Sequence, residues 1–319
     1  MDIRTVKQSV YHIDTIVLSV AAIGLIILFS NLTPHFLVMT NFRVIFETMA
    51  VLSILAVGIN FLLVAGEIDI SFVSVLELSA AVAAVASPSN TIYLIFLGIF
   101  AAFLVGLVNG FFVTKLGIPS FLVTLATMSG VQGIVMIVCN YRAVLLQNNL
   151  IPQIFYGRYF GGIATSVYWM IIVIVIAAIS ASKTKFGRWI YATGGNERAA
   201  RLMGIPTLKV KLILFCLNGA LAGLAGLILA SRALSARPAM GQGYFMPAIA
   251  APILGGALLT GGTGSVYRTA LACFVLTVIT NGVNLLGLEP AYRDIFMCII
   301  LLSALSVRAI QSRGIGSKV

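Results

Sequence analysis

The chain has 319 residues, of which 60% are hydrophobic and only 9% are charged, and its mean hydropathy is +1.09. Soluble domains average about 25% charged residues, so this composition excludes an ordinary water-soluble globule and indicates that lipid surrounds most of the chain. The net charge of +11 does not indicate nucleic-acid binding, because the basic residues lie in short connections between apolar runs, as in membrane proteins.

The predicted elements are transmembrane helices, because a bilayer core requires about 20 apolar residues per helix. The first apolar run resembles a signal peptide, but no small-residue cleavage site follows it, which favours an uncleaved span. Ten spans are predicted: 13–30, 44–64, 70–86, 92–113, 120–138, 163–181, 210–231, 245–259, 266–286 and 293–307. The third and eighth are short and are the weakest. We therefore expect an all-α, polytopic membrane protein in which residues 1–319 form one transmembrane domain.

The distribution of Lys and Arg predicts the orientation. With ten spans and both termini on the cytoplasmic side, the inner segments hold fourteen Lys and Arg and the outer segments hold six. Cytoplasmic loops carry such an excess, so this orientation is favoured. Merging two spans would instead place the termini on opposite sides.

Polar residues within the apolar runs are candidates for a translocation pathway, because a carboxylate in lipid costs at least a few kcal/mol. Glu67 and Asp69 predict a helix break, with Ser71 capping the helix that follows. Asp69 alternatively satisfies backbone N–H groups at that break, and Glu77 is interpreted as an internal hydrogen-bonding residue. Buried amides also hold helices together in lipid. The pathway candidates are Asn60, Glu67, Asp69, Ser71, Asn109 and Asn281.

A weak internal repeat relates two parts of the chain, about 44–138 and 210–307. "VNGFFVTKLGIPSF" at 108–121 resembles "TNGVNLLGLEPAY" at 280–292, with Pro119 matching Pro290. Five spans separate the matched segments, so they would cross the membrane in opposite directions, as in transporters with inverted repeats. Chance recurrence of such short motifs is the alternative. "NGALAGLAG" at 218–226 spaces small residues by four, which predicts close helix packing.

The connection 183–209 has the most concentrated charge of the chain. Asn196 is a suitable N-cap for a helix over 197–203, with Glu197 in its first turn. Gly204 is suited to the left-handed position after the helix, and Pro206 prevents its continuation. Two turns are unstable alone in water, so this helix must dock on its own bundle or on another protein.

The segment "GRWIYATGGNERAARLMGIPTLKVK" at 187–211 resembles the cytoplasmic loop of permease subunits of sugar-type ABC importers, of the ribose, xylose and arabinose type. "GEIDIS" at 66–71, "NGFFVTKLGIPSFLVTLATM" at 109–128 and "AIAAPILGGALLTGGTGSV" at 248–266 resemble the same family. The resemblance implies a coupling helix that fits a cleft on an ATP-hydrolysing subunit. Its residues would be Gly195, Asn196, Glu197, Ala199, Ala200, Arg201, Gly204 and Ile205.

The resemblance also implies the partners and the location. They are ABC ATPase subunits that hold ATP and Mg²⁺, a secreted solute-binding protein, and a second permease copy or paralogue, in the cytoplasmic (inner) membrane of a bacterium. The expected solute is a monosaccharide. Relatives that import autoinducer-2 or branched-chain amino acids share parts of the pattern. Glu67, Val73 and the segment 245–247 depart from the family's usual residues.

Four arginines are predicted on the outer side, where they would dock the solute-binding protein or remain solvated loop charges: Arg142, Arg158, Arg232 and Arg237. No G-x-x-x-x-G-K-[ST] motif, metal-binding motif or nucleophile–base pair is visible, so we expect no catalytic residue, no metal and no cofactor bound by this chain. Two alternatives remain. A stand-alone secondary transporter or channel would use Glu67 or Asp69, and a membrane enzyme would need a polar catalytic cluster.

Overall fold

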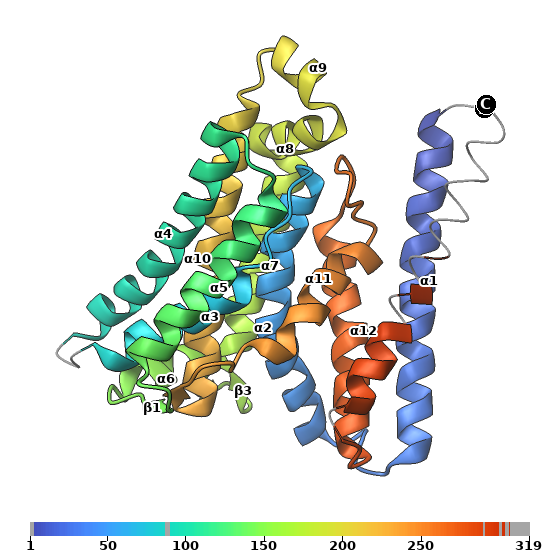
Figure 1. The fold of residues 1–319 in the computed structure, drawn as a ribbon. Helices are drawn as coiled ribbons and strands as arrows, with labels where there is room; N and C mark the ends of the chain where they lie inside the picture. The colour runs from blue at the N-terminus through green and yellow to red at the C-terminus, as the bar shows by residue number, and fades with distance from the viewer. Residues whose placement is uncertain (1–2, 87–89, 290, 300–301, 304–305, 307–319) are drawn as a thin grey trace. The chain divides into compact units, whose positions relative to one another are not determined.

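The computed structural model describes residues 3–86, 90–289, 291–299, 302–303 and 306, with the backbone alone for residues 3–14. Over these residues the chain is mostly helical with almost no strand, which confirms the predicted all-α class. The elements in Figure 1 are α1 (Ile3–Leu32), α2 (Met39–Val64), α3 (Phe72–Val85), α4 (Thr91–Leu116), α5 (Ser120–Val138), α6 (Leu150–Tyr156), α7 (Thr165–Lys183), α8 (Lys185–Gly195), α9 (Glu197–Leu202), α10 (Thr207–Ala233), α11 (Phe245–Leu254), α12 (Val266–Leu285) and a 3-10 helix at Gln242–Tyr244.

Two short antiparallel ladders join the loops near α6. Strand β1 (Val144–Leu145) pairs with β4 (Ser235–Ala236), and β2 (Arg158–Tyr159) pairs with β3 (Ile163–Ala164). Each strand has two residues, so the ladders fix loop positions and add no sheet to the core.

Seven helices of the described chain are long and apolar enough to cross a membrane: α1, α2, α4, α5, α7, α10 and α12. The two weakest predicted spans correspond to short helices, since α3 has 14 residues and α11 has 10. Residues 291–299 are also helical. The remainder of the predicted tenth span lies largely outside the described residues, as does Pro290. The count of ten therefore stays a prediction.

The described chain divides into two compact units, and the first comprises Met1–Ile45 and Phe274–Val319. Its apolar cluster contains Phe29, Phe36 and Val278, with the Phe29 and Phe36 rings 5.7 Å apart.

The second unit, Phe46–Cys273, is built around α10, which packs against α3 and α4. Glycines allow the close approach: a Cβ on Gly219 would lie 2.5 Å from the Ala102 carbonyl oxygen, and one on Gly106 would lie 2.3 Å from that of Phe215. No larger residue fits there, so the close packing predicted for 218–226 is confirmed.

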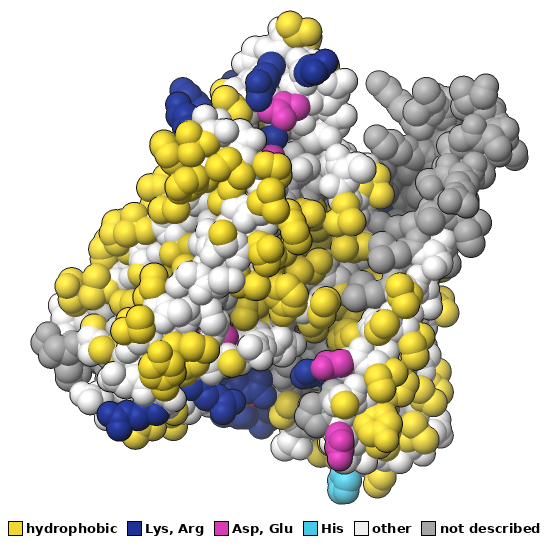
Figure 2. Space-filling view, viewed as in Figure 1, with side chains coloured by type: hydrophobic (Ala, Val, Ile, Leu, Met, Phe, Trp, Pro, Cys, Tyr) yellow, Lys and Arg dark blue, Asp and Glu magenta, His cyan; other side chains and the backbone are white. Residues whose placement is uncertain are grey.

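Within the second unit, α8 and α9 lie at one end of the long helices, and α6 with the β-ladders lies at the other (Figure 1). Figure 2 shows dark blue Lys and Arg side chains at these two ends and mostly yellow side chains between them. This pattern is the one expected of helices whose middle sections face hydrocarbon.

Candidate functional site

The short helix α9 has the start and stop signals predicted from its sequence. The Asn196 side chain accepts a hydrogen bond from the Ala199 N–H at 3.0 Å, as an N-cap does. The helix ends at Leu202, and Gly204 follows with φ of +80°. The predicted range 197–203 is therefore confirmed to within one residue. The preceding helix α8 was not predicted, although Thr184 caps it by accepting from the Gly187 N–H at 3.1 Å.

One face of α9 packs on the protein and the other is exposed. Ala200 is buried, whereas Ala199 is exposed. At the end of the helix, Leu202 is 89% exposed and Met203 is 83% exposed. Two large apolar side chains with so little cover form a small apolar tip, which is typical of a surface that a partner covers.

Ion pairs connect α9 to the break between α2 and α3. Glu197 pairs with Arg201 at 2.5 Å and with Lys211 at 2.8 Å. Lys211 also lies 2.6 Å from Glu67, and these two side chains are only 12% and 10% exposed. Lys211, on α10, thus bridges two carboxylates that belong to separate segments. We call these three residues the Lys211 bridge.

The protonation of Glu197 reflects this pairing. Partial burial raises the pKa of its carboxyl, but the hydrogen bonds and charges of Lys211 and Arg201 outweigh burial and leave the pKa below its usual value. Glu197 is therefore charged at neutral pH and available to both cations.

Besides the Lys211 bridge, there is a second connection, made by main-chain atoms, which joins α8 to the end of α2. The Gly262 N–H donates to the Val64 carbonyl at 2.8 Å. A Cβ on Gly194 would lie 1.7 Å from that same carbonyl oxygen and 2.7 Å from the Gly262 nitrogen. Gly262 itself has φ of +78°, a conformation that favours glycine. We call the contact of Gly194, Val64 and Gly262 the glycine junction.

The segment 65–71 between α2 and α3 is the predicted helix break, and Asp69 organises it. One Asp69 oxygen accepts from the backbone N–H of Ser71 at 2.8 Å and from its hydroxyl at 2.6 Å. The other accepts from the Asn218 amide at 2.9 Å. The backbone role suggested for Asp69 is thus confirmed. Ser71 occupies the predicted N-cap position of α3, but its side chain makes no cap hydrogen bond, and its hydroxyl donates to Asp69.

A buried chain of hydrogen bonds continues from this break into α4 and α5. The Asn109 amide donates to the Ser71 hydroxyl at 2.9 Å, and the Thr127 hydroxyl donates to the Asn109 carbonyl oxygen at 2.7 Å. Asp69, Ser71 and Asn109 are therefore brought together, as a polar cluster inside an apolar bundle.

The other pathway candidates have separate partners. Glu67 pairs with Lys211, and Asn60 accepts from the Thr269 hydroxyl at 3.2 Å. In the first unit, Asn281 donates to Asn41 at 2.8 Å and accepts from it at 3.0 Å. These amides hold helices to one another, which is the helix-linking role considered for them.

At the α6 end, a buried carboxylate on α2 organises the loops. Glu47 pairs with Arg158 at 2.9 Å and accepts from the Tyr156 hydroxyl. Burial and the bond to this carboxylate raise the pKa of Tyr156 to about 12, so its hydroxyl remains a donor. Arg232 donates to Thr48 at 3.1 Å. Arg158 and Arg232 are therefore both anchored to α2.

Within the described part of the chain, the other two predicted outer arginines have no such anchor. Arg142 and Arg237 are exposed and lie just outside the β1–β4 ladder.

Glu77 accepts hydrogen bonds from the backbone N–H groups of Ala239 and Gly241 at 3.1 and 3.0 Å. These bonds confirm its internal hydrogen-bonding role and fix the loop after Arg237.

Sequence reasoning missed Lys211, Glu47 and the two glycines of the glycine junction. Lys211 was counted only as a basic loop residue. The unusual Glu67 could have indicated the role of Lys211, because a carboxylate near lipid requires a partner. The glycine contacts depend on tertiary packing and carry no local signal.

Residues 42–305 match the family described as branched-chain amino acid transport system / permease component. The chain is 36% identical over 283 residues to the ribose import permease protein of Bacillus subtilis (strain 168), covering 88% of each chain. It is 36% identical over 295 residues to the ribose import permease protein of Escherichia coli (strain K12), covering 90% of this chain and 91% of that one. It is 32% identical over 275 residues to the L-arabinose transport system permease protein of the same organism, covering 85% and 83%. No solved structure matches the chain.

Proposed function

The chain belongs to the family of branched-chain amino acid transport system permease components, and from this premise we propose that it is the membrane subunit of an ATP-binding-cassette importer for a monosaccharide. The similar proteins named above are import permeases for ribose and L-arabinose, and they cover most of this chain. A permease of this kind supplies the route through the bilayer, and the ATP and Mg²⁺ are held by separate ATPase subunits.

The observation that carries the proposal is α9, a capped short helix whose apolar tip, Leu202 and Met203, is almost fully exposed. We assign this helix to the cytoplasmic face, where its tip and the exposed Ala199 would enter a cleft on an ATPase subunit. The proposed coupling residues are Gly195, Asn196, Glu197, Ala199, Ala200, Arg201, Gly204 and Ile205.

Movement of α9 would reach the interior through the Lys211 bridge and the glycine junction. Both connections end on the segment where α2 gives way to the helix break. Asp69 and Ser71 of the break form the polar cluster with Asn109 of α4, which we propose as part of the route. A sugar hydroxyl both donates and accepts hydrogen bonds, so it would exchange with these bonds as the helices separate.

The α6 end would face outward and dock a secreted solute-binding protein. Arg142 and Arg237 offer exposed positive charge, and Arg158 is 48% exposed beside Glu47. Arg232 would position this surface through Thr48. Two permease copies, or this chain and a paralogue, would form the complete route in a bacterial cytoplasmic membrane, with both termini inside.

The test is reconstitution of the chain with its ATPase and solute-binding protein in proteoliposomes. We expect accumulation of a labelled monosaccharide only when ATP is present on the ATPase side. Accumulation by this chain alone on a proton gradient would instead make it a stand-alone transporter. ATP-driven uptake of autoinducer-2 with no uptake of any monosaccharide would overturn the substrate assignment and leave the importer class intact.

A further inference from the structure

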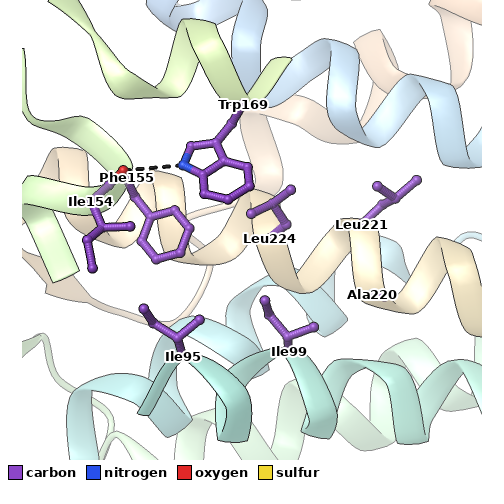
Figure 3. Close-up of a pocket in the computed structure, with 8 residues that line it drawn as sticks. All are labelled: Ile95, Ile99, Ile154, Phe155, Trp169, Ala220, Leu221 and Leu224. Carbon is purple, nitrogen blue, oxygen red and sulfur yellow. Dashed lines mark hydrogen bonds between the residues drawn. The ribbon is translucent and has the colours of Figure 1, made fainter. Parts of the chain in front are cut away.

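A crevice of about 430 Å³ lies among α4, α6, α7 and α10, and none of its lining residues is one proposed for transport. Figure 3 shows Ile95 and Ile99 pointing from α4 toward Phe155 of α6 and Leu224 of α10. On α4, Ile95 and Ile99 are four residues apart, and so are Ala220 and Leu224 on α10. The members of each pair therefore lie on one face of their helix. Ala220 carries only a methyl group, and its small size contributes to the depth of the crevice.

The lining of the crevice offers hydrocarbon and almost nothing polar. The indole N–H of Trp169 is already used, since it donates to the Ile154 carbonyl at 3.2 Å (Figure 3). The Phe155 and Trp169 rings stack with centroids 5.7 Å apart. A sugar placed here would lose its hydrogen bonds to water without replacement. The crevice is therefore unsuited to the transported solute.

Two of the helices that line the crevice, α4 and α7, each carry several exposed large apolar side chains, such as Phe96 and Ile176. In the most apolar 18-residue stretch of α4, and likewise of α7, only 22% of the residues are buried inside the protein. In a membrane protein such surfaces meet lipid. The crevice is thus an indentation bordered by lipid-facing helices, so the acyl chains of the bilayer can reach it.

We propose that this crevice binds one acyl chain of a membrane lipid, at a discrete site on the lipid-facing periphery of the helix bundle. A helix from a second copy of the chain is a poorer fit. One helical turn, 5.4 Å long and about 10–12 Å wide, occupies roughly 420–610 Å³, so a single turn would fill the whole space. A flexible unbranched chain follows an irregular slot of this size along its length.

The experiment uses the full chain in nanodiscs that contain a phospholipid with a photoreactive diazirine on its acyl chain, with cross-links mapped by mass spectrometry. We expect labelling of 95–99 and 220–224. Ala220→Phe, which fills the crevice, should lower this labelling about tenfold, the change expected when about two methylene groups lose their burial. Ile213→Phe is the matched control, because Ile213 is exposed on the same helix and does not line the crevice.

Leu224→Ala enlarges the crevice without adding bulk and should keep or increase the labelling, which covers the case in which Ala220→Phe fails to fold. If Ala220→Phe and Ile213→Phe were labelled equally, the labelling would reflect only general contact with lipid, and the proposal would be overturned. Disulfide-linked dimers of a Leu224→Cys variant, made in a Cys298→Ser background because Cys298 is exposed, would put a second copy there and also overturn it.

Discussion

The Nζ atom of Lys211 lies 2.6 Å from Oε1 of Glu67 and 2.8 Å from Oε2 of Glu197. One cation therefore joins the proposed coupling helix to the interior helix break. Glu67 is also a position where the chain departs from the usual residue of the family it resembles.

Lys211→Gln should destabilise the protein and uncouple it. Removing one member of a fully buried ion pair costs about 3–5 kcal/mol, and the slight exposure of this pair reduces the expected loss to about 2–3 kcal/mol. ATP hydrolysis should continue with little uptake, whereas Lys211→Arg should retain most uptake. Thermal unfolding and the ratio of solute moved to ATP hydrolysed are the measurements. Additive effects of Lys211→Gln and Glu67→Gln in a double-mutant cycle would show that the contact carries no coupling.

Ala199→Arg should block docking of the ATPase without unfolding the permease. Ala199 is exposed on α9, so the larger side chain meets only the partner. Co-purification of the ATPase should fall while the melting temperature stays unchanged. Ala200→Arg is the contrasting variant, because Ala200 is buried and its replacement should lower the melting temperature itself. Undiminished co-purification with Ala199→Arg would contradict the docking assignment.

Gly194→Ala should disrupt the glycine junction, because its Cβ would lie 1.7 Å from the Val64 oxygen. Overpacking of this kind costs about 1–3 kcal/mol or more. Gly195→Ala is the neighbouring control, since a Cβ there has no heavy atom within 4 Å. The melting temperature of each purified variant is the measurement. Equal stability of the two variants would mean that α8 does not contact α2 in this way.

Asn196→Ala should loosen α9 by about 1 kcal/mol, the usual loss when an N-cap side chain is removed. Hydrogen exchange of the backbone amides in 197–203 should become faster, with little change in the long helices. Asn196→Asp keeps a capping oxygen and should restore protection. An exchange pattern unaffected by Asn196→Ala would show that packing alone holds the helix.

The anchoring of α9 should resist mild acid. The folded-state pKa of Glu197 lies below the ordinary value of 4.5, so its stabilising contribution is present at neutral pH and is lost as the pH falls through the folded pKa. Protection of 197–203, corrected for intrinsic exchange rates, should stay level from pH 7 to about 4.5 and decline below it. Glu197→Gln should remove this decline. Loss of protection already between pH 7 and 5 would identify another titrating group.

Local signals in the sequence were sufficient for α9 and for the membrane class. Asn196, Gly204 and Pro206 set the limits of α9 through their own backbone preferences, and the length of apolar runs gave most of the spans. The family was also predictable, because several motifs resembled it in order, and the match over residues 42–305 confirms it.

The candidate site was only partly predictable, because its contacts join residues far apart in the chain. Glu67 was noticed as an unusual carboxylate, but its partner lies 144 positions away at Lys211. Ser71 was expected to cap α3 and does stand at its N-cap position, yet its hydroxyl donates to Asp69 and accepts from the Asn109 amide instead of from a backbone N–H of the helix. Which groups bond to this hydroxyl depends on tertiary placement, and the sequence pattern does not specify it.

The glycine junction consists of main-chain atoms and contains no ionised group, whereas the Lys211 bridge consists of charges. Dissolved ions screen an exposed charge pair more than a buried one, so within the bridge they act mainly on the contact with Glu197, whose side chain is 32% exposed, and they leave the backbone contact almost unaffected. The two connections from α8 and α9 to the end of α2 therefore differ in their response to ionic strength. A concentrated electrolyte would weaken one link and preserve the other, which allows the mechanical contribution of each to be measured separately in the unmutated protein.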